Sequence, residues 1–472
     1  MRLLLINPES YTWLPEQYYL PSSLMALGTL AEQTGATVSV LDLNVIKYKK
    51  NEDCQNSVLE RVREFEPQLV GIGCMFAGQL ESVMKYSKAI KDIFPHIKIV
   101  VGGMQPTLFS NEILENCTSI DFIAIGEGEL PLVLLMQYMD EVISIERVPS
   151  LAYRSNGSIV HNARKVVNDL NILPMSNYSL VKIPDYYHEE TLHWHNPRNL
   201  PINATLPILT SRGCPFNCNF CCLYEVMGKK MRYKNPQFVV DEIEFLYKEH
   251  NHRHFSFFDD NLIIKKSHIM EVCNEIVKRN LNIQFETPNG VAIRFIDEEV
   301  LSAMCTAGMV NLSLPIEHGS EYIRNHVIRK GLPTEKIYEV AELTKKYTDL
   351  LVRAFFIIGF PEETPQTLQD TFDMIQKIDV DKPIVNNLMP YAGTAVFNQC
   401  VRDNLFIDKI DLKNIWKLGD LSFSSTRQFY IRPYNMSVDE LEEFRKKFDV
   451  FVANQIKRKA RWHESTGNTE KI

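Results

Sequence analysis

The stretch Thr210-Ser-Arg-Gly-Cys214-Pro-Phe-Asn-Cys218-Asn-Phe-Cys221-Cys222 places three cysteines at the spacing CxxxCxxC, with a fourth directly after them. It continues from the apolar segment Pro207–Ser211, which is expected to be a strand. The cysteines should therefore lie on a loop at the carboxyl end of that strand, where β/α folds carry their chemistry. Three thiolates on one short loop can bind three irons of a cubane cluster and leave the fourth iron open to a substrate or cosubstrate. We expect Cys214, Cys218 and Cys221 to hold a [4Fe–4S] cluster, with Cys222 as a neighbour rather than a ligand.

Neither a structural zinc site nor a buried core accounts well for these cysteines. A structural zinc site normally has four protein ligands, and no further CxxC or histidine pair stands at zinc-finger spacing. Free cysteines are also common in buried cores, but Gly213 and Pro215 on either side of Cys214 indicate a loop. The spacing therefore favours an iron–sulfur cluster over both alternatives.

A regular alternation of strands and helices surrounds the cysteines and defines a domain over residues 206–400. Helical stretches such as Pro236–His250 and Ser267–Arg279 separate the strands. The expected strands are Pro207–Ser211, His254–Phe258, Ile283–Thr287, Val310–Ile316, Val352–Ile358 and Ile384–Met389. Six units fall short of the eight in a closed barrel, so we expect an open, partial (β/α)6 TIM-like barrel. Residues 401–472 should form a mainly helical region with an amphipathic helix around Val438–Ala460.

Residues 1–145 contain a separate α/β pattern. Runs rich in Val, Ile and Leu alternate with helical stretches, as in a parallel sheet that is covered on both faces. The expected strands are Leu3–Asn7, Val38–Asp42, Leu69–Cys74, Ile97–Gly102 and Phe122–Gly126. Five such strands predict a doubly wound, flavodoxin-like domain. Residues 146–205 contain many prolines and are expected to form a linker that packs against both domains, with a small hairpin of Ser150–Tyr153 and Ile159–His161.

Composition narrows the classes of function. The chain has 472 residues, of which 45% are hydrophobic and 23% charged, as in a soluble globular protein. Its net charge of −8 argues against broad nucleic-acid binding. No segment approaches the roughly 18 apolar residues of a spanning helix, and the run Leu3–Ile6 is too short for a signal peptide. We expect a cytoplasmic protein without a transmembrane segment, in which clustered cysteines indicate a metal rather than disulfides.

Features beyond the cysteines resemble the radical S-adenosylmethionine superfamily over residues 205–400. They are Phe220, Asp259-Asp260-Asn261, Ile316-Glu317-His318-Gly319-Ser320 and Gly359-Phe360-Pro361-Glu362-Glu363, in the order typical of the family. The resemblance implies that the amino and carboxylate groups of S-adenosylmethionine chelate the unique iron. It also implies that one electron from the reduced cluster breaks a sulfur–carbon bond, which gives methionine and a 5′-deoxyadenosyl radical. The protein would orient these cofactors and exclude water.

The same resemblance assigns roles to residues near strand ends. Asp259 and Asp260 would help to hold the methionine amine, because an acidic group suits an ammonium. Glu317 would contact the ribose or the methionine part, and Arg353 could pair with the methionine carboxylate. Two structural alternatives stay open: Asp260 and Asn261 could cap the following helix, and Glu317 and Arg353 could form a salt bridge.

The position of the first domain, directly upstream of such a core, resembles the cobalamin-binding class of the superfamily. Its supporting segments are Leu20–Leu24, Val101–Thr107 and Gly126–Glu129. The resemblance implies cobalamin contacts at Gly102 and Gly103, which would lie against the nucleotide tail, and at Gly126 and Glu127.

The cobalamin-binding pattern DxHxxG is absent here. Leu41–Val45, after the second strand, contains no histidine, so we expect no histidine ligand to cobalt from that loop. The loop Glu9–Leu14, with Tyr11 and Trp13, is a candidate for the lower side of the cobalt.

Together these features predict a cobalamin-dependent radical enzyme that methylates an unreactive carbon or a phosphorus of a small molecule or natural product. An electron donor such as a flavodoxin or ferredoxin would be its partner. Cyclisation or rearrangement is the alternative chemistry. A methylthiotransferase is disfavoured because Cys54, Cys74 and Cys117 are scattered, and a non-catalytic cobalamin or cluster sensor is disfavoured by the intact motif order. His188, His193 and His195 are expected to be surface residues rather than a metal site.

Overall fold

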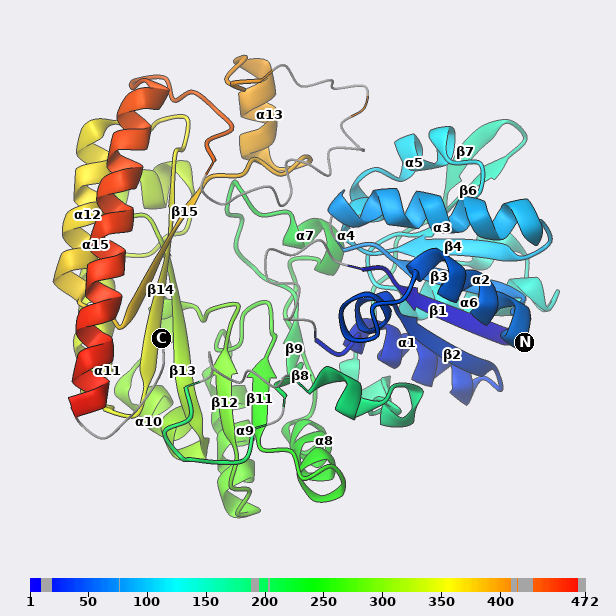
Figure 1. Cartoon of the computed structure of the whole chain (residues 1–472), viewed down its shortest axis with the longest axis horizontal. Coiled ribbons are helices and arrows are strands. Elements are labelled where there is room, and N and C mark those ends of the chain that lie inside the picture. The colour runs from blue at the N-terminus through cyan, green and yellow to red at the C-terminus, as the bar shows by residue number, and fades with distance from the viewer. Residues whose placement is uncertain are drawn as a thin grey trace. The chain divides into compact units, whose positions relative to one another are not determined.

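The computed structural model describes residues 1–9, 19–75, 77–187, 195–202, 204–408, 414 and 428–465 (Figure 1). The chain divides into two compact units. The first comprises Met1–Tyr187 with Cys222–Gly228 and Ile410–Ser424, and the second comprises His188–Cys221, Lys229–Lys409 and Ser425–Ile472. The cysteine cluster therefore lies in the second unit, while the short segment directly after it packs with the first.

The first unit is built on a seven-stranded sheet in the order β2-β1-β3-β4-β5-β6-β7. Its strands are β1 (Arg2–Asn7), β2 (Thr37–Asp42), β3 (Leu69–Gly73), β4 (Lys98–Gly102), β5 (Phe122–Ala124), β6 (Leu151–Ser155) and β7 (Ser158–His161). The first five strands are parallel. The order reverses at β1, which confirms the doubly wound arrangement that the apolar runs predicted.

Helices cover this sheet on both faces. They are α1 (Ser22–Gln33), α2 (Cys54–Phe65), α3 (Leu80–Ile93), α4 (Met104–Leu108), α5 (Ser110–Asn116) and α6 (Glu129–Met139). The short helix α7 (Leu223–Met227) belongs to the same unit and packs against α4. Helix α1 packs against α6, and α2 packs against α3. Leu3–Ile6 in β1 are at most 1% exposed, because a parallel strand between two helical layers has no solvent face.

The predicted hairpin exists and extends the sheet. Strand β6 pairs antiparallel with β5, and β7 pairs antiparallel with β6. Asn156 and Gly157 connect the two strands with φ angles of 50° and 75°. Positive φ at both central residues is the requirement of a tight two-residue hairpin turn, and Asn-Gly meets it. The five parallel strands expected from the sequence are therefore followed by two antiparallel ones.

The second unit is built on a six-stranded parallel sheet in the order β15-β14-β13-β12-β11-β8. Its strands are β8 (Leu206–Ile208), β11 (His254–Phe257), β12 (Gln284–Thr287), β13 (Met309–Glu317), β14 (Leu351–Ile358) and β15 (Lys382–Asn387). Each strand lies beside its predecessor in this series, as in a barrel rather than a doubly wound sheet. This confirms the partial barrel of six β/α units.

The helices between these strands are α8 (Pro236–Glu249), α9 (Lys266–Lys278), α10 (Glu298–Ala307), α11 (Thr334–Thr344) and α12 (Pro365–Ile378). A short antiparallel pair, β9 (Ser211–Arg212) and β10 (Arg232–Tyr233), brackets the cysteine loop and α7. The two ends of the segment that contains the cysteine loop and α7 are therefore held together by backbone pairing.

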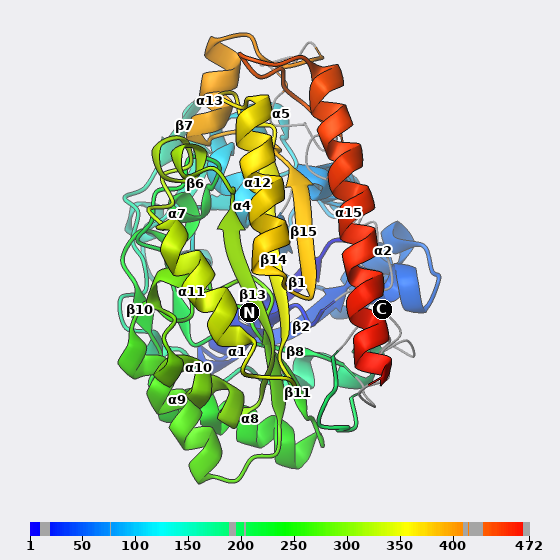
Figure 2. The ribbon, with the colours of Figure 1, turned by 90° about the vertical axis from the view of Figure 1, so that its left-hand side faces the viewer.

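The C-terminal part is helical, as predicted. It contains α13 (Ala395–Arg402) and the long helix α15 (Val438–Ser465), which runs beside α12 and the edge strand β15 (Figure 2). Gln455 donates from Nε2 to the carbonyl oxygen of Val380 at 2.6 Å. Helix α15 thereby covers the edge of the sheet, which would otherwise expose unpaired backbone groups. None of the helices in the described ranges is long and apolar enough to cross a membrane.

Candidate active site

The cysteine loop is attached to the barrel through Asp259, the second residue after β11. Asp259 is 1% exposed, and its carboxylate accepts the backbone N–H of Thr210 at 3.1 Å and the Thr210 hydroxyl at 2.7 Å. The hydroxyl of Ser211 donates to the same carboxylate. Burial raises the pKa of Asp259, and these donors partly offset the effect. Both carboxylate oxygens are engaged, so Asp259 holds the start of the cysteine loop rather than facing an open ligand site.

Asp260 holds the next turn of the same loop. Its Oδ2 accepts the backbone N–H of Gly213 at 2.8 Å. Burial raises the pKa of Asp260 to about 6; the hydrogen bond from Gly213 opposes this rise, and the charge of Asp259 adds to it. The helix-cap alternative for Asp260 and Asn261 is wrong, because α9 begins at Lys266 with Lys265 in the cap position.

Asn261 is a neighbour of the cysteines that the sequence did not reveal as such. Its side-chain N–H points to Sγ of Cys214 at 3.9 Å, while its Oδ1 accepts the backbone N–H of Ala292 at 3.2 Å. The second contact fixes the amide so that its donor faces the thiol. In the sequence, the one indication of this role is that Asn261 directly follows Asp259 and Asp260, whose carboxylates hold the cysteine loop.

The thiols of Cys214, Cys218 and Cys221 are half-buried and form no disulfide. Burial raises the pKa of Cys218 to about 12; Lys330 opposes this rise, while Glu317 and the other two thiols add to it. The three thiols therefore lie close enough to interact electrostatically.

Within the described part of the chain, no three Cys, His, Asp or Glu side chains converge tightly enough to hold a single metal ion. A cubane cluster, in which each thiolate binds a different iron, stays the centre that these three thiols are predicted to hold. Cys222, by contrast, has its Sγ 3.2 Å from Sδ of Met104 in the first unit.

Glu317, the last residue of β13, lies beside the cysteines together with Lys330. Nζ of Lys330 donates to Oε1 of Glu317 at 2.7 Å, with side chains 17% and 9% exposed. Burial lowers the pKa of Lys330, but Glu317 and then Cys218 outweigh it, so the net pKa is raised. Lys330 is a site residue that the sequence did not predict, because it reaches the strand end from a loop thirteen positions later.

Arg353 is not brought to this edge of the barrel. It is the third residue of β14, beside Ser313 in the middle of β13, whereas the strand ends at Ile358. Its nearest acidic partner is Glu286, at 3.9 Å. The alternative salt bridge with Glu317 is not formed, because Glu317 pairs with Lys330 instead. The contact of Arg353 with the methionine carboxylate stays a prediction.

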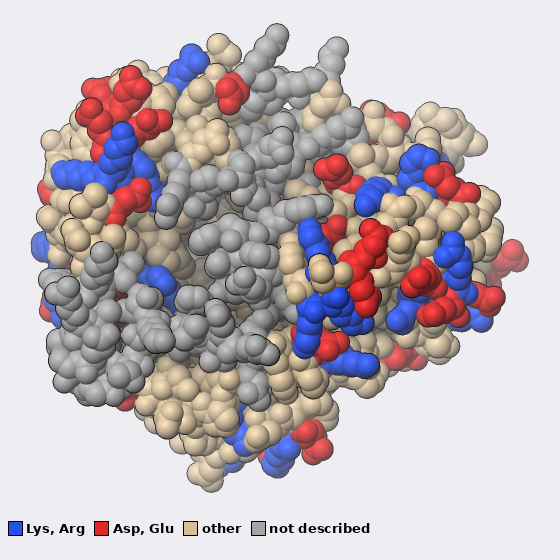
Figure 3. Space-filling model, in the orientation of Figure 1, with Lys and Arg blue, Asp and Glu red and all other residues tan. Residues whose placement is uncertain are grey.

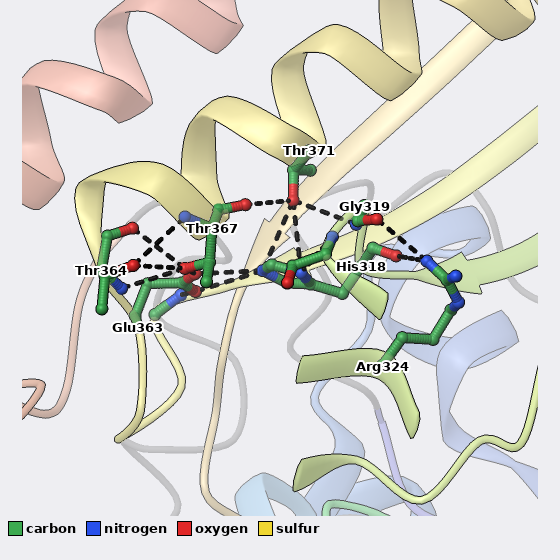
Figure 4. Close-up of polar contacts among 9 residues, drawn as sticks. His318, Gly319, Arg324, Glu363, Thr364, Thr367 and Thr371 are labelled. Carbon is green, nitrogen blue, oxygen red and sulfur yellow. Dashed lines mark hydrogen bonds and ion pairs between the residues drawn. The ribbon is translucent and has the colours of Figure 1, made fainter. Parts of the chain in front are cut away.

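His318 and Glu363 join the strand-end motifs of β13 and β14 (Figure 4). Both are fully buried, with Nε2 of His318 3.1 Å from Oε1 of Glu363. Because Nδ1 of His318 accepts the backbone N–H of Ser320 at 3.0 Å, the ring proton sits on Nε2 and is donated to Glu363. The backbone N–H of Gly359 and the hydroxyl of Thr367 also donate to this carboxylate. The pair is therefore a structural connection between the two strand ends.

The predicted cobalamin residues lie at the carboxyl edge of the first sheet. Gly102 ends β4, and Gly103 has φ +117°. A Cβ on Gly103 would lie 2.4 Å from the carbonyl oxygen of Cys74, so no other residue fits there. At Gly126 a Cβ would meet Arg164 and Val226.

Glu127 is buried and accepts the backbone N–H of Val167 at 3.1 Å. Packing within the unit accounts for Gly103, Gly126 and Glu127, whereas a Cβ on Gly102 would make only ordinary contact with Ala124, at 3.5 Å. The contacts of these residues with cobalamin stay predictions.

The same edge carries features that suit a large corrin ring. Tyr19 and Met75 are 41% and 45% exposed there. Oε1 of Glu9 accepts the hydroxyl of Tyr86 at 2.6 Å, while its buried Oε2 has no partner. These side chains are candidates for contact with a large ligand, whose faces would be apolar and whose rim would be polar.

The loop after β2 carries no histidine, as the sequence indicates, and its Asn44 donates to Asp42 at 2.9 Å. Tyr11 and Trp13 lie outside the described residues, as do His188 and His193. His195 is buried rather than at the surface, and its Nε2 lies 2.7 Å from the carbonyl oxygen of Asp349.

Two segments of the chain match known families. Residues 15–136 match the B12 binding domain, and residues 208–375 match the Radical SAM superfamily. The chain is 23% identical over 453 residues to the cytidylyl-2-hydroxyethylphosphonate methyltransferase of Streptomyces wedmorensis, covering 86% of this chain and 83% of that protein. It is 26% identical over 407 residues to the anaerobic magnesium-protoporphyrin IX monomethyl ester cyclase of Rubrivivax gelatinosus, covering 84% and 70%.

The fold is also that of a solved structure. The radical S-adenosylmethionine methyltransferase TsrM from Kitasatospora setae, with cobalamin and a [4Fe–4S] cluster bound, superposes with a TM-score of 0.72 at 19% identity. The match covers 87% of this chain and 79% of that one.

Exchange of each cysteine tests the ligand assignment. We expect C214S, C218S and C221S each to lose most iron and sulfide after anaerobic reconstitution, because a cubane held by two thiolates is labile. C222S is the matched control and should keep the wild-type content. Iron and sulfide analysis of the four variants checks this, and loss of iron from C222S alone would contradict the assignment.

Removal of the buried imidazole tests the connection between β13 and β14. H318A should lower the free energy of unfolding by about 2 to 4 kcal/mol, because the buried carboxylate of Glu363 loses a donor. H326A, which removes an exposed imidazole nearby, should change it by less than about 0.5 kcal/mol. Denaturant unfolding of the proteins before cluster reconstitution measures both, and equal effects would refute the role of His318.

The two matched segments fall on the two sheets: a doubly wound sheet in the first unit, and a partial barrel with a three-thiol loop at its carboxyl edge in the second. Sequence, fold and site geometry agree on both. The chain is a radical S-adenosylmethionine enzyme with an N-terminal B12-binding domain.

Proposed function

We propose that this enzyme transfers a methyl group from S-adenosylmethionine, by way of cobalamin, to an unreactive carbon or a phosphorus of a small-molecule substrate. The observation that carries the proposal is the three-thiol loop at the carboxyl edge of the barrel, in the same chain as a B12-binding unit. When bound, the cluster supplies one electron for cleavage of S-adenosylmethionine, and cobalamin carries the methyl group.

The residues of the chain divide this work. Cys214, Cys218 and Cys221 would hold three irons, and Asn261 donates a hydrogen bond toward the first of these thiols. Glu317, at the end of β13, would contact S-adenosylmethionine from the neighbouring strand end. Asp259 and Asp260 act on the cofactor through the loop that they hold, since their hydrogen bonds go to Thr210, Ser211 and Gly213.

The substrate is proposed to be a small molecule rather than a nucleic acid. Among the described residues on the face in Figure 3, Lys and Arg are interspersed with Asp and Glu. Phosphate backbones are bound by concentrated positive charge. A low-potential donor such as a flavodoxin or ferredoxin would supply the electron.

A cyclisation reaction is the second candidate, because the cyclase of Rubrivivax gelatinosus aligns over 84% of this chain. The two candidates differ in the fate of the methyl group. A methylase consumes one S-adenosylmethionine to methylate cobalt and releases S-adenosylhomocysteine, whereas a cyclase needs only reductive cleavage and releases 5′-deoxyadenosine.

Deuterated methyl groups distinguish the candidates without a known substrate. We expect protein reconstituted with cluster and cobalamin, then incubated with methyl-deuterated S-adenosylmethionine and dithionite, to place the labelled methyl on extracted cobalamin and to release S-adenosylhomocysteine. Mass spectrometry measures both. The C214S/C218S/C221S variant is the control for reductive cleavage and should release no 5′-deoxyadenosine.

Two further results would each change the assigned function. 5′-Deoxyadenosine without labelled cobalamin or S-adenosylhomocysteine would replace the methylase with the cyclase. If protein that holds both cofactors releases neither 5′-deoxyadenosine nor S-adenosylhomocysteine, the result would favour a non-catalytic cobalamin or cluster sensor over both enzymes.

A further inference from the structure

Lys330 brings a positive charge to the cluster loop. Its ammonium lies 2.7 Å from the carboxylate of Glu317, and both side chains are largely buried. It also interacts electrostatically with Cys218 and Cys214, two of the three proposed iron ligands. The cation and the carboxylate therefore form one ion pair beside the thiols, in a region where water screens charge poorly.

The backbone around Lys330 holds it there. The N–H of Asn219, within the cysteine loop, donates to the carbonyl oxygen of Ile328 at 3.1 Å. The N–H of Lys330 donates to the carbonyl oxygen of Arg324 at 2.9 Å. Arg324 is fully buried and donates to the carbonyl oxygens of His318 and Gly319 at 2.7 and 3.0 Å. The segment carrying Lys330 is thus bonded both to the cysteine loop and to the end of β13.

Charge near a cluster changes its affinity for an electron. A [4Fe–4S] core with three thiolates has one excess negative charge, and reduction adds a second. A nearby cation stabilises the reduced form more than the oxidised form, and a nearby anion does the opposite. Hydrogen bonds and charges are the means by which proteins adjust such potentials.

We propose that the Lys330–Glu317 ion pair sets the reduction potential of the cluster, with Lys330 raising it and Glu317 lowering it. Lys330 therefore affects the entry of the electron indirectly, through the potential of the cluster, and is a positioning residue rather than a catalytic one. The inference rests on the proposed cluster at Cys214, Cys218 and Cys221.

Two variants break the same ion pair but change the charge in opposite directions. K330Q removes the cation and leaves Glu317, so the potential should fall. E317Q removes the anion and leaves Lys330, so the potential should rise. A purely structural role predicts shifts of the same sign, because both variants lose the same 2.7 Å contact.

The measurement is a redox titration of the reconstituted cluster, followed by electron paramagnetic resonance, without S-adenosylmethionine or substrate. At a fixed potential we expect K330Q to lower the ratio of reduced to oxidised cluster about tenfold, equivalent to about 59 mV for one electron. E317Q should raise the ratio, and K330R should stay near wild type. K278Q, which removes the charge of an exposed lysine on α9, is the matched control.

The outcomes separate the two proposals. Shifts of equal sign in K330Q and E317Q, or no shift in either, would overturn the role of the ion pair. Absence of iron and of a reduced-cluster signal in the wild-type protein would instead overturn the cluster assignment itself. Denaturant unfolding of each variant before reconstitution shows whether it folds, and K330R supplies the charge-retaining comparison if K330Q does not.

Discussion

The buried carboxylate of Asp259 is the interaction on which the proposed active site depends. A carboxylate at 1% exposure is costly unless its lone pairs are filled. Here the backbone N–H and hydroxyl of Thr210 and the hydroxyl of Ser211 fill them. All of these donors precede Cys214 by four residues or fewer. The requirement to satisfy this one buried anion therefore fixes where the cysteine loop leaves the sheet.

The same solution recurs at the other side of the barrel. Glu363 is a fully buried carboxylate that receives donors from His318, Gly359 and Thr367. One carboxylate connects the ends of β8 and β11, and the other connects the ends of β13 and β14. Apolar packing alone would allow these strand ends to slide past one another. Hydrogen bonds to a buried carboxylate hold them in place. Two buried carboxylates thereby hold strand ends at the edge that should carry the chemistry.

Sequence patterns predicted the fold well because burial determines them directly. Continuous apolar runs such as Leu3–Ile6 follow from a sheet covered on both faces, and the CxxxCxxC spacing keeps the thiols on one loop. Position along a strand was harder to predict. Arg353 precedes Ile358 by five residues, or about 16 Å of extended chain, so its being on the fifth strand did not place it near the active edge. Lys330 was missed because only tertiary contacts bring its loop to Glu317.

The turn at the end of β13 connects Glu317, which the sequence predicted as a site residue, with Lys330, which it did not predict. Glu317 has φ +71°, a conformation that costs a non-glycine residue about 1 kcal/mol or more. It persists because the next residues are fully constrained. His318 is bonded to Glu363, and a Cβ on Gly319 would lie 2.2 Å from the backbone of Thr371, so this turn packs directly on α12. The constrained turn points the carboxylate of Glu317 at Lys330. The strain at Glu317 is thus maintained by its neighbours, and its result is a fixed pair of opposite charges beside the thiols.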